Sequence, residues 1–237
     1  MRVILAVMAH PDDVDFWAAG TVATWVAGGA RVTYLLVTGG DAGGFEAGAE
    51  RGEMGRRRRD EQRRAAGVLG VGDVRFLDGF ADGAVAVTDE LVGGIVHAIR
   101  ELRPDLVLAQ SPTRTWHDIR LSHPDHLAVG EATARAVYPF ARNPFADFGA
   151  AGSDAASLAA FAVRELWLQG DPEPNHVVDV TAFRAQRREA LAAHASQHPD
   201  LPGALDRAER EAGGVAARWG LPKGSLAEEF RRILIPH

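Results

Sequence analysis

The alternation of short apolar runs with longer helix-like segments restricts the fold of this chain more than any other feature. The run Arg2–Met8 is continuously apolar after its first residue, which is typical of a strand buried on both faces. Further strands are expected at Arg31–Val37, Val74–Leu77, Asp105–Gln110, Val163–Leu168 and Val177–Val180. Helices are expected at Phe16–Gly28, Glu53–Leu69, Asp89–Leu102, Pro124–Val137 and Ala182–Gln197. This order predicts an α/β fold with a parallel sheet flanked by helices, in which Arg2–Met8 and Asp105–Gln110 are central neighbours.

Local signals mark several boundaries. Thr88 is expected to cap the Asp89–Leu102 helix, and Pro104 to end it. Pro124 suits the first position of its helix. The Gly-rich segment Thr38–Gly52 and the segment Arg142–Ser157 are expected to be loops.

The length of 237 residues suits one large α/β domain over residues 1–237. We expect its core at about residues 2–198 and a polar C-terminal extension with short amphipathic pieces at about 199–237. No internal repeat and no linker composition divides the sequence.

Composition excludes several classes of protein. A net charge of -6 argues against a general nucleic-acid binder, and the run Arg56–Arg59, followed by Asp60 and Glu61, is interpreted as a solvated helix face. The absence of cysteine excludes disulfides, thiolate ligands and a thiol nucleophile. With no secretory signal and no apolar stretch of about 18 residues, we expect a cytoplasmic protein without a transmembrane segment. The sequence does not determine the oligomeric state, and a homo-oligomer is one of the possibilities.

Two His- and Asp-rich clusters follow strands that are expected to be neighbours. His10-Pro11-Asp12-Asp13 comes directly after the first strand, and His123-Pro124-Asp125-His126 comes after the Asp105–Gln110 strand. The carboxyl ends of parallel strands meet at one edge of a sheet, where ligands bind in open α/β folds. Either cluster alone is equally typical of a turn and a helix cap. The pair together favours a metal-dependent active site.

The spacing within each cluster assigns the roles. His10 and Asp13 are three residues apart, so within one helical turn they share a face, and His126 supplies a third ligand. Two His and one Asp form an ordinary Zn²⁺ ligand set that leaves positions open, so we expect one Zn²⁺ per chain, with Fe²⁺ as the alternative. Asp12 diverges from Asp13 and is free to act as general base on a water activated by the metal. His123 would stabilise an oxyanion or protonate a leaving amine.

The paired clusters resemble the PIG-L/LmbE-like family of zinc-dependent N-acetylglucosaminyl de-N-acetylases. The resemblance spans about residues 2–140 and includes Gly20-Thr21, Thr38-Gly39-Gly40, Arg58, Glu61, Ala65-Ala66, Leu69-Gly70 and Asp82-Gly83. His194-Ala195-Ser196-Gln197 looks like a late element of the same family.

The resemblance implies a Rossmann-like three-layer sandwich and the hydrolysis of an acetamide on a small N-acetylated sugar conjugate. Family substrates carry inositol, malate, thiol conjugates, a second sugar or antibiotic scaffolds. The resemblance supports His10, Asp13 and His126 as ligands and implies that Arg58 and Asp82 touch substrate hydroxyls.

Two further substrate-binding residues are expected, and two positions depart from the family pattern. Trp116 could stack on a sugar face, and His194 is a candidate pocket residue. Val14 stands where many members have Glu, which we interpret as tolerated because the base is Asp12. Leu121 stands where some members have a Tyr oxyanion donor, so His123 acts alone or with another group such as His194.

Other interpretations remain open at this point. A 2-His-1-carboxylate set also suits a non-haem Fe(II) oxygenase, although such sites are more often found in β-barrels. A non-catalytic sugar-binding module would bind without releasing acetate. His194 and His198 are four residues apart, but Ala195 stands in place of the metalloprotease Glu, and the glycines of 39–44 lack phosphate-loop spacing, so neither is interpreted as a site.

Overall fold

A single mixed β-sheet runs through the centre of the chain, which the computed structural model describes for residues 1–45, 48, 50–116, 118–148 and 158–236. The order of its seven described strands is β3-β2-β1-β4-β5-β7-β6. The strands are β1 (Val3–Met8), β2 (Arg31–Leu36), β3 (Asp73–Phe76), β4 (Leu106–Gln110), β5 (Glu165–Gln169), β6 (His176–Asp179) and β7 (Ala227–Leu234). Strands β1 to β5 are parallel, and β7 is antiparallel to both β5 and β6. The predicted pairing of the first strand with Asp105–Gln110 is confirmed, because β1 pairs with β4.

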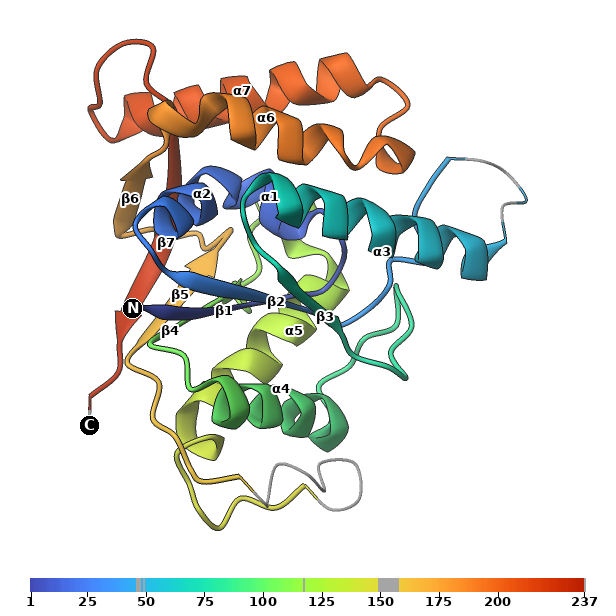
Figure 1. Cartoon of the computed structure of the whole chain (residues 1–237), viewed down its shortest axis with the longest axis vertical. Helices are drawn as coiled ribbons and strands as arrows, with labels where there is room; N and C mark the ends of the chain where they lie inside the picture. The colour runs from blue at the N-terminus through green and yellow to red at the C-terminus, as the bar shows by residue number, and fades with distance from the viewer. Residues whose placement is uncertain (46–47, 49, 117, 149–157, 237) are drawn as a thin grey trace.

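Helices cover both faces of the sheet, as Figure 1 shows. On one face lie α1 (Asp13–Trp17), α2 (Ala19–Ala27) and α3 (Arg51–Val68), and α6 (Arg184–Ala192) packs on these three helices. On the other face lie α4 (Asp89–Leu102) and α5 (Pro124–Arg135). The helix α7 (Leu201–Arg218) packs on α6 and β7. This confirms the predicted three-layer, mostly parallel α/β sandwich. No helix in the described part of the chain is long and apolar enough to cross a bilayer.

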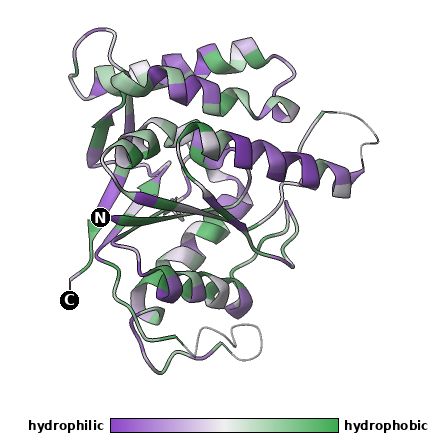
Figure 2. Ribbon diagram, in the orientation of Figure 1, coloured by the Kyte–Doolittle hydropathy of each residue, from purple (hydrophilic) through white to green (hydrophobic). Residues whose placement is uncertain are grey.

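The core divides into two clusters because side chains alternate along each strand. Leu5 and Val7 of β1 pack with α4 and α5, whereas Ile4, Ala6 and Met8 pack with α2 and α3. Figure 2 shows that much of α3, by contrast, is hydrophilic. The sheet therefore holds the ends of β1, β2 and β4 rigidly at one edge.

Several predicted helix boundaries hold, and others shift. The helix over Asp89–Leu102 is confirmed with its cap, since the Leu91 N–H donates to Thr88 Oγ1 at 3.2 Å. The helix expected over Phe16–Gly28 begins at Asp13 and is interrupted at Ala18, whose φ of -140° and ψ of 7° are not helical. The first turn of α2 packs closely against Val180. A Cβ atom at Gly20 would lie only 2.5 Å from Val180 Cβ, so this position has no room for a side chain.

The last third of the chain differs most from the prediction. The single helix expected over Ala182–Gln197 is divided into three elements in the structure. These are a 3-10 turn at Thr181–Phe183, the helix α6, which ends at Ala192, and a second 3-10 turn at Ala195–Gln197. After residue 199, where only short amphipathic pieces were predicted, the structure has the long helix α7 and the strand β7 inside the sheet. Residues 149–157 of the expected loop Arg142–Ser157 lie outside the described residues. The remaining short elements are η1 (Ile119–Ser122), η2 (Ala136–Phe140) and η5 (Thr181–Phe183).

Candidate metal and substrate site

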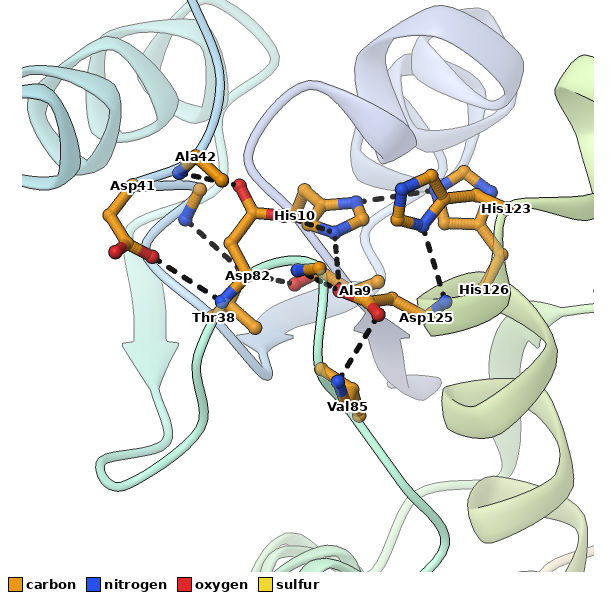
Figure 3. Close-up of polar contacts among 12 residues, drawn as sticks. Ala9, His10, Thr38, Asp41, Ala42, Asp82, Val85, His123, Asp125 and His126 are labelled. Carbon is orange, nitrogen blue, oxygen red and sulfur yellow. Dashed lines mark hydrogen bonds and ion pairs between the residues drawn. The ribbon is translucent and has the colours of Figure 1, made fainter. Parts of the chain in front are cut away.

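Backbone-directed hydrogen bonds tie three strand ends together at the edge where the two predicted clusters lie. The N–H of Ala9, just after β1, donates to Gln110 Oε1 at the end of β4 at 3.0 Å. The Thr38 hydroxyl, just after β2, donates to the carbonyl of Ala9 at 2.9 Å. The loop that carries the first cluster is therefore fixed to both neighbouring strands. Figure 3 shows its His10 facing the residues of the second cluster.

The three predicted metal ligands converge there. Asp13 Oδ1 lies 3.1 Å from His126 Nε2, and Asp13 Oδ2 lies 3.5 Å from His10 Nδ1. His126 Nε2 and His10 Nδ1 are 3.3 Å apart. Ligand atoms about 2.0–2.2 Å from one tetrahedral ion stand roughly 3.3–3.6 Å from each other. The two imidazole nitrogens therefore have the spacing expected of ligands to a single ion of the Zn²⁺ type, and each lies beside one oxygen of Asp13.

The other nitrogen of His10 faces two carboxylates. His10 Nε2 lies 3.1 Å from Asp125 Oδ2 and 3.1 Å from Asp82 Oδ1. Asp125 is fixed in turn by the backbone N–H groups of Gly83 and Val85, at 2.8 and 3.2 Å. Burial acts to lower the pKa of His10, but hydrogen bonds to Asp125, Asp13 and Asp82 outweigh it and raise the pKa to about 12. A carboxylate on the far nitrogen is the usual partner of a metal-binding imidazole.

Two groups of three donors lie close enough together to hold an ion, and neither contains Asp13. Among the described residues these are His10 with His123 and His126, and His10 with Asp82 and Asp125. In the second group the oxygens already accept hydrogen bonds: Asp125 from two backbone N–H groups and Asp82 from the Ala42 N–H at 3.0 Å. Asp82 and Asp125 therefore contact His10 Nε2, whereas the predicted ligands Asp13 and His126 lie near His10 Nδ1.

Asp13 is held as a carboxylate by its surroundings. Its Oδ2 accepts the His10 N–H at 2.8 Å and the Gln110 amide at 2.8 Å. Its backbone carbonyl accepts from Gln169 Nε2 at 3.2 Å. Burial tends to raise the pKa of Asp13, but the positive charges of His126 and His10 hold it well below its usual range.

Asp12 has an unusual backbone conformation and its own set of partners. Its φ of 92° is in the region that non-glycine residues rarely adopt. The Asp12 N–H donates to Gln62 Oε1 at 2.9 Å, and Arg58 Nη2 lies 3.3 Å from Asp12 Oδ2. Its side chain is 19% exposed, so a small molecule can reach it. Burial raises the pKa of Asp12, Arg58 opposes this, and the charge of Asp13 adds to it.

His123 caps α5 with its ring. The Asp125 N–H donates to His123 Nδ1 at 3.2 Å, so Nδ1 is unprotonated and the hydrogen of the neutral ring is on Nε2. The ring centroid lies 5.0 Å from that of His10 and 5.3 Å from that of His126. Burial, with the charges of His10 and His126, lowers the pKa of His123. A neutral His123 can thus donate a hydrogen bond beside the three ligand groups.

The predicted substrate residues differ in their access to the site. Arg58 is 5% exposed and bonds the carbonyls of Gly40 and Pro11 at 2.9 and 2.7 Å, while Asp82 lies 3.8 Å from Arg58 and bonds His10. Trp116 is 80% exposed on its loop, and its neighbour at 117 lies outside the described residues. His194 is fully buried and does not line an open surface.

His194 instead belongs to a buried polar network behind Asp12. Its Nε2 lies 2.9 Å from Asp15 Oδ2, which also accepts from Gln62 Nε2 at 2.7 Å. Because α6 ends at Ala192, His194 and His198 do not share a helix. Leu121, at the position of the family's Tyr, follows Asp118 in η1 and packs near Gly170.

Sequence reasoning missed the supporting residues of the site. Gln110, Gln169, Gln62 and Asp15 carry no motif of their own, although Gln110 and Gln169 share a position at the ends of β4 and β5. Asp125 is part of the second cluster, but nothing in the sequence assigned it a function. Its place between two histidines was the one available signal.

The chain is similar in sequence and fold to several proteins of known family or structure. The profile described as GlcNAc-PI de-N-acetylase, PIG-L, matches residues 5–137. The diacetylchitobiose deacetylase of Thermococcus kodakarensis is 31% identical over 201 residues, which are 84% of this chain and 72% of that protein. A probable N-acetyl-α-D-glucosaminyl L-malate deacetylase of Bacillus anthracis is 30% identical over 224 residues, which are 92% and 91% of the two chains. The structure of N,N'-diacetylchitobiose deacetylase from Pyrococcus horikoshii has a TM-score of 0.86 at 24% identity, covers 98% of this chain and 84% of its own, and shows the shared fold.

Proposed function

The chain belongs to the GlcNAc-PI de-N-acetylase (PIG-L) family, and on that premise we propose that it is a zinc-dependent hydrolase that removes the acetyl group from an N-acetylglucosamine-type sugar conjugate. The observation that carries this proposal is the position of Asp13 between two histidines: its Oδ1 lies 3.1 Å from His126 Nε2, its Oδ2 lies 3.5 Å from His10 Nδ1, and the two nitrogens are 3.3 Å apart. Beside them lie one reachable carboxylate and one imidazole that can donate a hydrogen bond. Amide hydrolysis needs these parts together.

We assign the metal to His10, Asp13 and His126. This choice is supported by the opposite orientation of His10 Nε2, which bonds Asp125 and leaves Nδ1 for the ion. It is also supported by the hydrogen bonds to Asp13 Oδ2, which leave Oδ1 directed at His126. When bound, a divalent cation supplies Lewis-acid polarisation of the acetyl carbonyl and lowers the pKa of water.

Asp12 and His123 divide the proton chemistry. Asp12 takes a proton from the attacking water, which bonds to the carbonyl carbon. As negative charge develops on the carbonyl oxygen, His123 Nε2–H donates a hydrogen bond to it. Cleavage of the C–N bond sends the proton held by Asp12 to the departing nitrogen, which gives acetate and a free amine. Arg58, 3.3 Å from the Asp12 carboxylate, keeps that carboxylate directed to the reacting centre.

The sugar would bind over the same edge of the sheet. Arg58 and Asp82, which lie 3.8 Å apart, are assigned to substrate hydroxyls, and the exposed Trp116 is assigned to stack on a ring. His194 acts only through Asp15, because its ring is fully buried.

The experiment is a screen for amine and acetate release from N-acetylated sugar conjugates with the Zn²⁺-loaded protein. We expect Asp12→Asn to keep its zinc, measured by mass spectrometry, and to lose at least 100-fold in kcat. Asp60→Asn, an exposed change on α3, is the matched control and should keep full activity. Asp12→Asn with near-normal turnover, or a wild-type protein that releases no acetate from any conjugate, would overturn the proposal.

A further inference from the structure

Two fully buried side chains, Asp15 and His194, lie one side chain away from the proposed base Asp12. His194 Nε2 lies 2.9 Å from Asp15 Oδ2. In the part of the chain that the structure describes, the other two polar atoms of the pair, Asp15 Oδ1 and His194 Nδ1, are buried without a hydrogen-bond partner. A buried polar pair that is only partly satisfied costs stability, and apolar side chains of similar volume are often more stable in its place. Stability of the fold therefore does not account for this pair.

Gln62, on α3, connects the pair to Asp12. Its Nε2 donates to Asp15 Oδ2 at 2.7 Å, and its Oε1 accepts the Asp12 N–H at 2.9 Å. The two ends of an amide side chain have nearly the same shape, but only the nitrogen end donates, and a carboxylate only accepts. Asp15 therefore holds the nitrogen end of Gln62 toward itself and leaves the oxygen end for Asp12. The direction of the hydrogen bond at Asp12 is thus set by Asp15.

Asp12 depends on such restraints because its backbone is strained. Its φ of 92° is a conformation that a residue other than glycine keeps only where its surroundings hold it. Arg58 supplies one restraint, since it bonds the Pro11 carbonyl at 2.7 Å and lies 3.3 Å from Asp12 Oδ2. The bond from the Asp12 N–H to Gln62 is the other. When it is lost, the peptide between Pro11 and Asp12 can rotate, and the Asp12 carboxylate moves with it.

His194 is held in place by the turn that follows it, η6 (Ala195–Gln197). The N–H and the hydroxyl of Ser196 both donate to Glu61, at 3.1 and 2.6 Å. Glu61 is 2% exposed and precedes Gln62 on α3. One turn of α3 therefore holds η6 with Glu61 and reaches Asp12 with Gln62. The buried ring of His194 contacts this support and not the surface where a substrate binds.

We propose that His194 is a positioning residue for the hydrolysis: with Asp15, and through Gln62, it holds the backbone of Asp12 so that its carboxylate faces the reacting centre. The inference rests on the proposed deacetylase function and adds to it a residue from the last third of the chain. It assigns to His194 an effect on kcat, and none on zinc binding or on the affinity for substrate.

The first test measures the Zn²⁺-loaded full chain with an N-acetylated sugar conjugate that the wild type cleaves. His194→Leu removes the bond to Asp15, so we expect kcat to fall by about tenfold to 100-fold while KM stays within about twofold. The zinc content, measured by mass spectrometry, should not change. His194→Gln has an amide N–H that can donate to Asp15 again, and it should recover most of the lost kcat.

Glu228→Gln is the matched control, because it also disturbs a buried ion pair of the same layer of helices. Glu228 is 4% exposed, bonds Arg187 of α6 at 3.0 Å, and accepts the N–H groups of Gly20 and Thr21 at 3.0 and 2.7 Å. We expect this variant to lose stability and to keep the kcat of the wild type. A loss of kcat that came only from a less stable fold would appear in both variants.

The second test follows the Asp12 amide hydrogen and needs no turnover. NMR hydrogen exchange compares the Asp12 N–H with that of Leu108, which is fully buried in β4. General destabilisation accelerates both amides, whereas a lost restraint acts on Asp12 alone. We expect the ratio of the Asp12 rate to the Leu108 rate to rise by about tenfold in His194→Leu and to stay unchanged in Glu228→Gln.

The outcomes separate this inference from the proposed function. A kcat of His194→Leu within about twofold of the wild type, or an equal loss of kcat in Glu228→Gln, overturns the inference and leaves the function standing. So does a His194→Gln protein as slow as His194→Leu. If the wild type cleaves no conjugate, the proposed function fails, and the exchange ratio decides the inference: a selective rise at Asp12 supports it, and an unchanged ratio overturns it.

A second variant serves if His194→Leu does not fold. Asp15→Asn keeps the shape of the side chain but gives Gln62 a partner that can donate as well as accept, so the direction of the Gln62 amide is no longer set. We expect the same fall in kcat at unchanged KM and the same rise of the exchange ratio at Asp12. A wild-type kcat and a wild-type ratio in Asp15→Asn overturn the inference.

Discussion

Replacing Gln62 by Met should both destabilise the protein and slow its reaction. The Gln62 side chain is fully buried on α3, where its Oε1 accepts the Asp12 N–H at 2.9 Å and its Nε2 donates to Asp15 Oδ2 at 2.7 Å. Met has a volume similar to that of Gln, so the substitution creates little or no cavity. It does remove both hydrogen bonds of the Gln62 side chain. The Asp12 N–H loses its partner, whereas Asp15 keeps His194 at 2.9 Å.

The magnitude follows from these two losses. A buried amide left without a partner costs about 1–3 kcal/mol, and a lost hydrogen bond to a charged group costs about 1.5–3 kcal/mol. We therefore expect the free energy of unfolding of Gln62→Met to fall by about 3 kcal/mol, measured by urea denaturation. The left-handed conformation of Asp12 costs roughly 1–3 kcal/mol and loses one of its restraints, so its carboxylate should become misplaced. A displacement on the order of 1 Å is enough to lower kcat by about 100-fold with little change in KM.

Gln186→Met is the control, because Gln186 is exposed on α6 and should tolerate the change in both assays. A Gln62→Met protein as stable as the wild type within about 0.5 kcal/mol would refute the hydrogen-bond reasoning. Lost stability with an unchanged kcat would instead refute the positioning of Asp12 by Gln62.

Three further outcomes are expected. Glu228→Gln should lower the free energy of unfolding by about 3 kcal/mol, because this buried carboxylate bonds Arg187 and the N–H groups at the start of α2; a loss no larger than that of the more exposed Glu229→Gln would contradict this. Burial tends to raise the pKa of Glu165, but hydrogen bonds from Trp167 and Arg232 outweigh it and lower this pKa. The ionised Glu165 therefore contributes its full stabilisation to the fold above the ordinary pKa of 4.5, and this contribution is lost as the pH falls below that value. The stability difference between wild type and Glu165→Gln should therefore shrink between pH 7 and pH 3 in urea titrations of the metal-free protein, and a constant difference would disprove the link. Zn²⁺ at about 100 times its Kd should stabilise the protein by about 2.7 kcal/mol in thermal melts, and His126→Ala should abolish the effect; an undiminished effect in this variant would remove His126 from the ligand set.

The strands β1, β2, β4 and β5 were predictable from the sequence, because buried parallel strands are largely continuous apolar runs. Strand β7 was not, since its sequence Ala-Glu-Glu-Phe-Arg-Arg-Ile-Leu has neither such a run nor strict alternation. Its charged side chains find partners that only the fold brings near: Arg232 bonds Glu165 of β5 at 3.0 Å, and Glu228 bonds Arg187 of α6 at 3.0 Å. Pairing energy from distant segments thus overrides the weak local signal.

The same limit applies to the site. Asp13 and His126 lie beside His10 because each cluster follows one strand of a parallel pair, which the order of strands in the sequence predicted. Spacing gave no information on Gln62 or Gln110, whose side chains reach the first cluster from α3 and from β4. A glutamine has no sequence signature as a support, and only the register of β1 against β4 identifies Gln110 as one.

The two nitrogens of His10 explain why the second cluster contains both a histidine and an aspartate. Nδ1 faces His126 and Asp13, while Nε2 faces Asp125, one residue before His126. One turn of α5 therefore supplies a partner to each side of a single ring. The backbone N–H groups of the loop after Asp82 hold Asp125 from behind, so the loop between β3 and α4 is coupled to the ligand geometry. Substitutions in that loop should consequently alter the proposed metal site even where no side chain of the loop touches an ion.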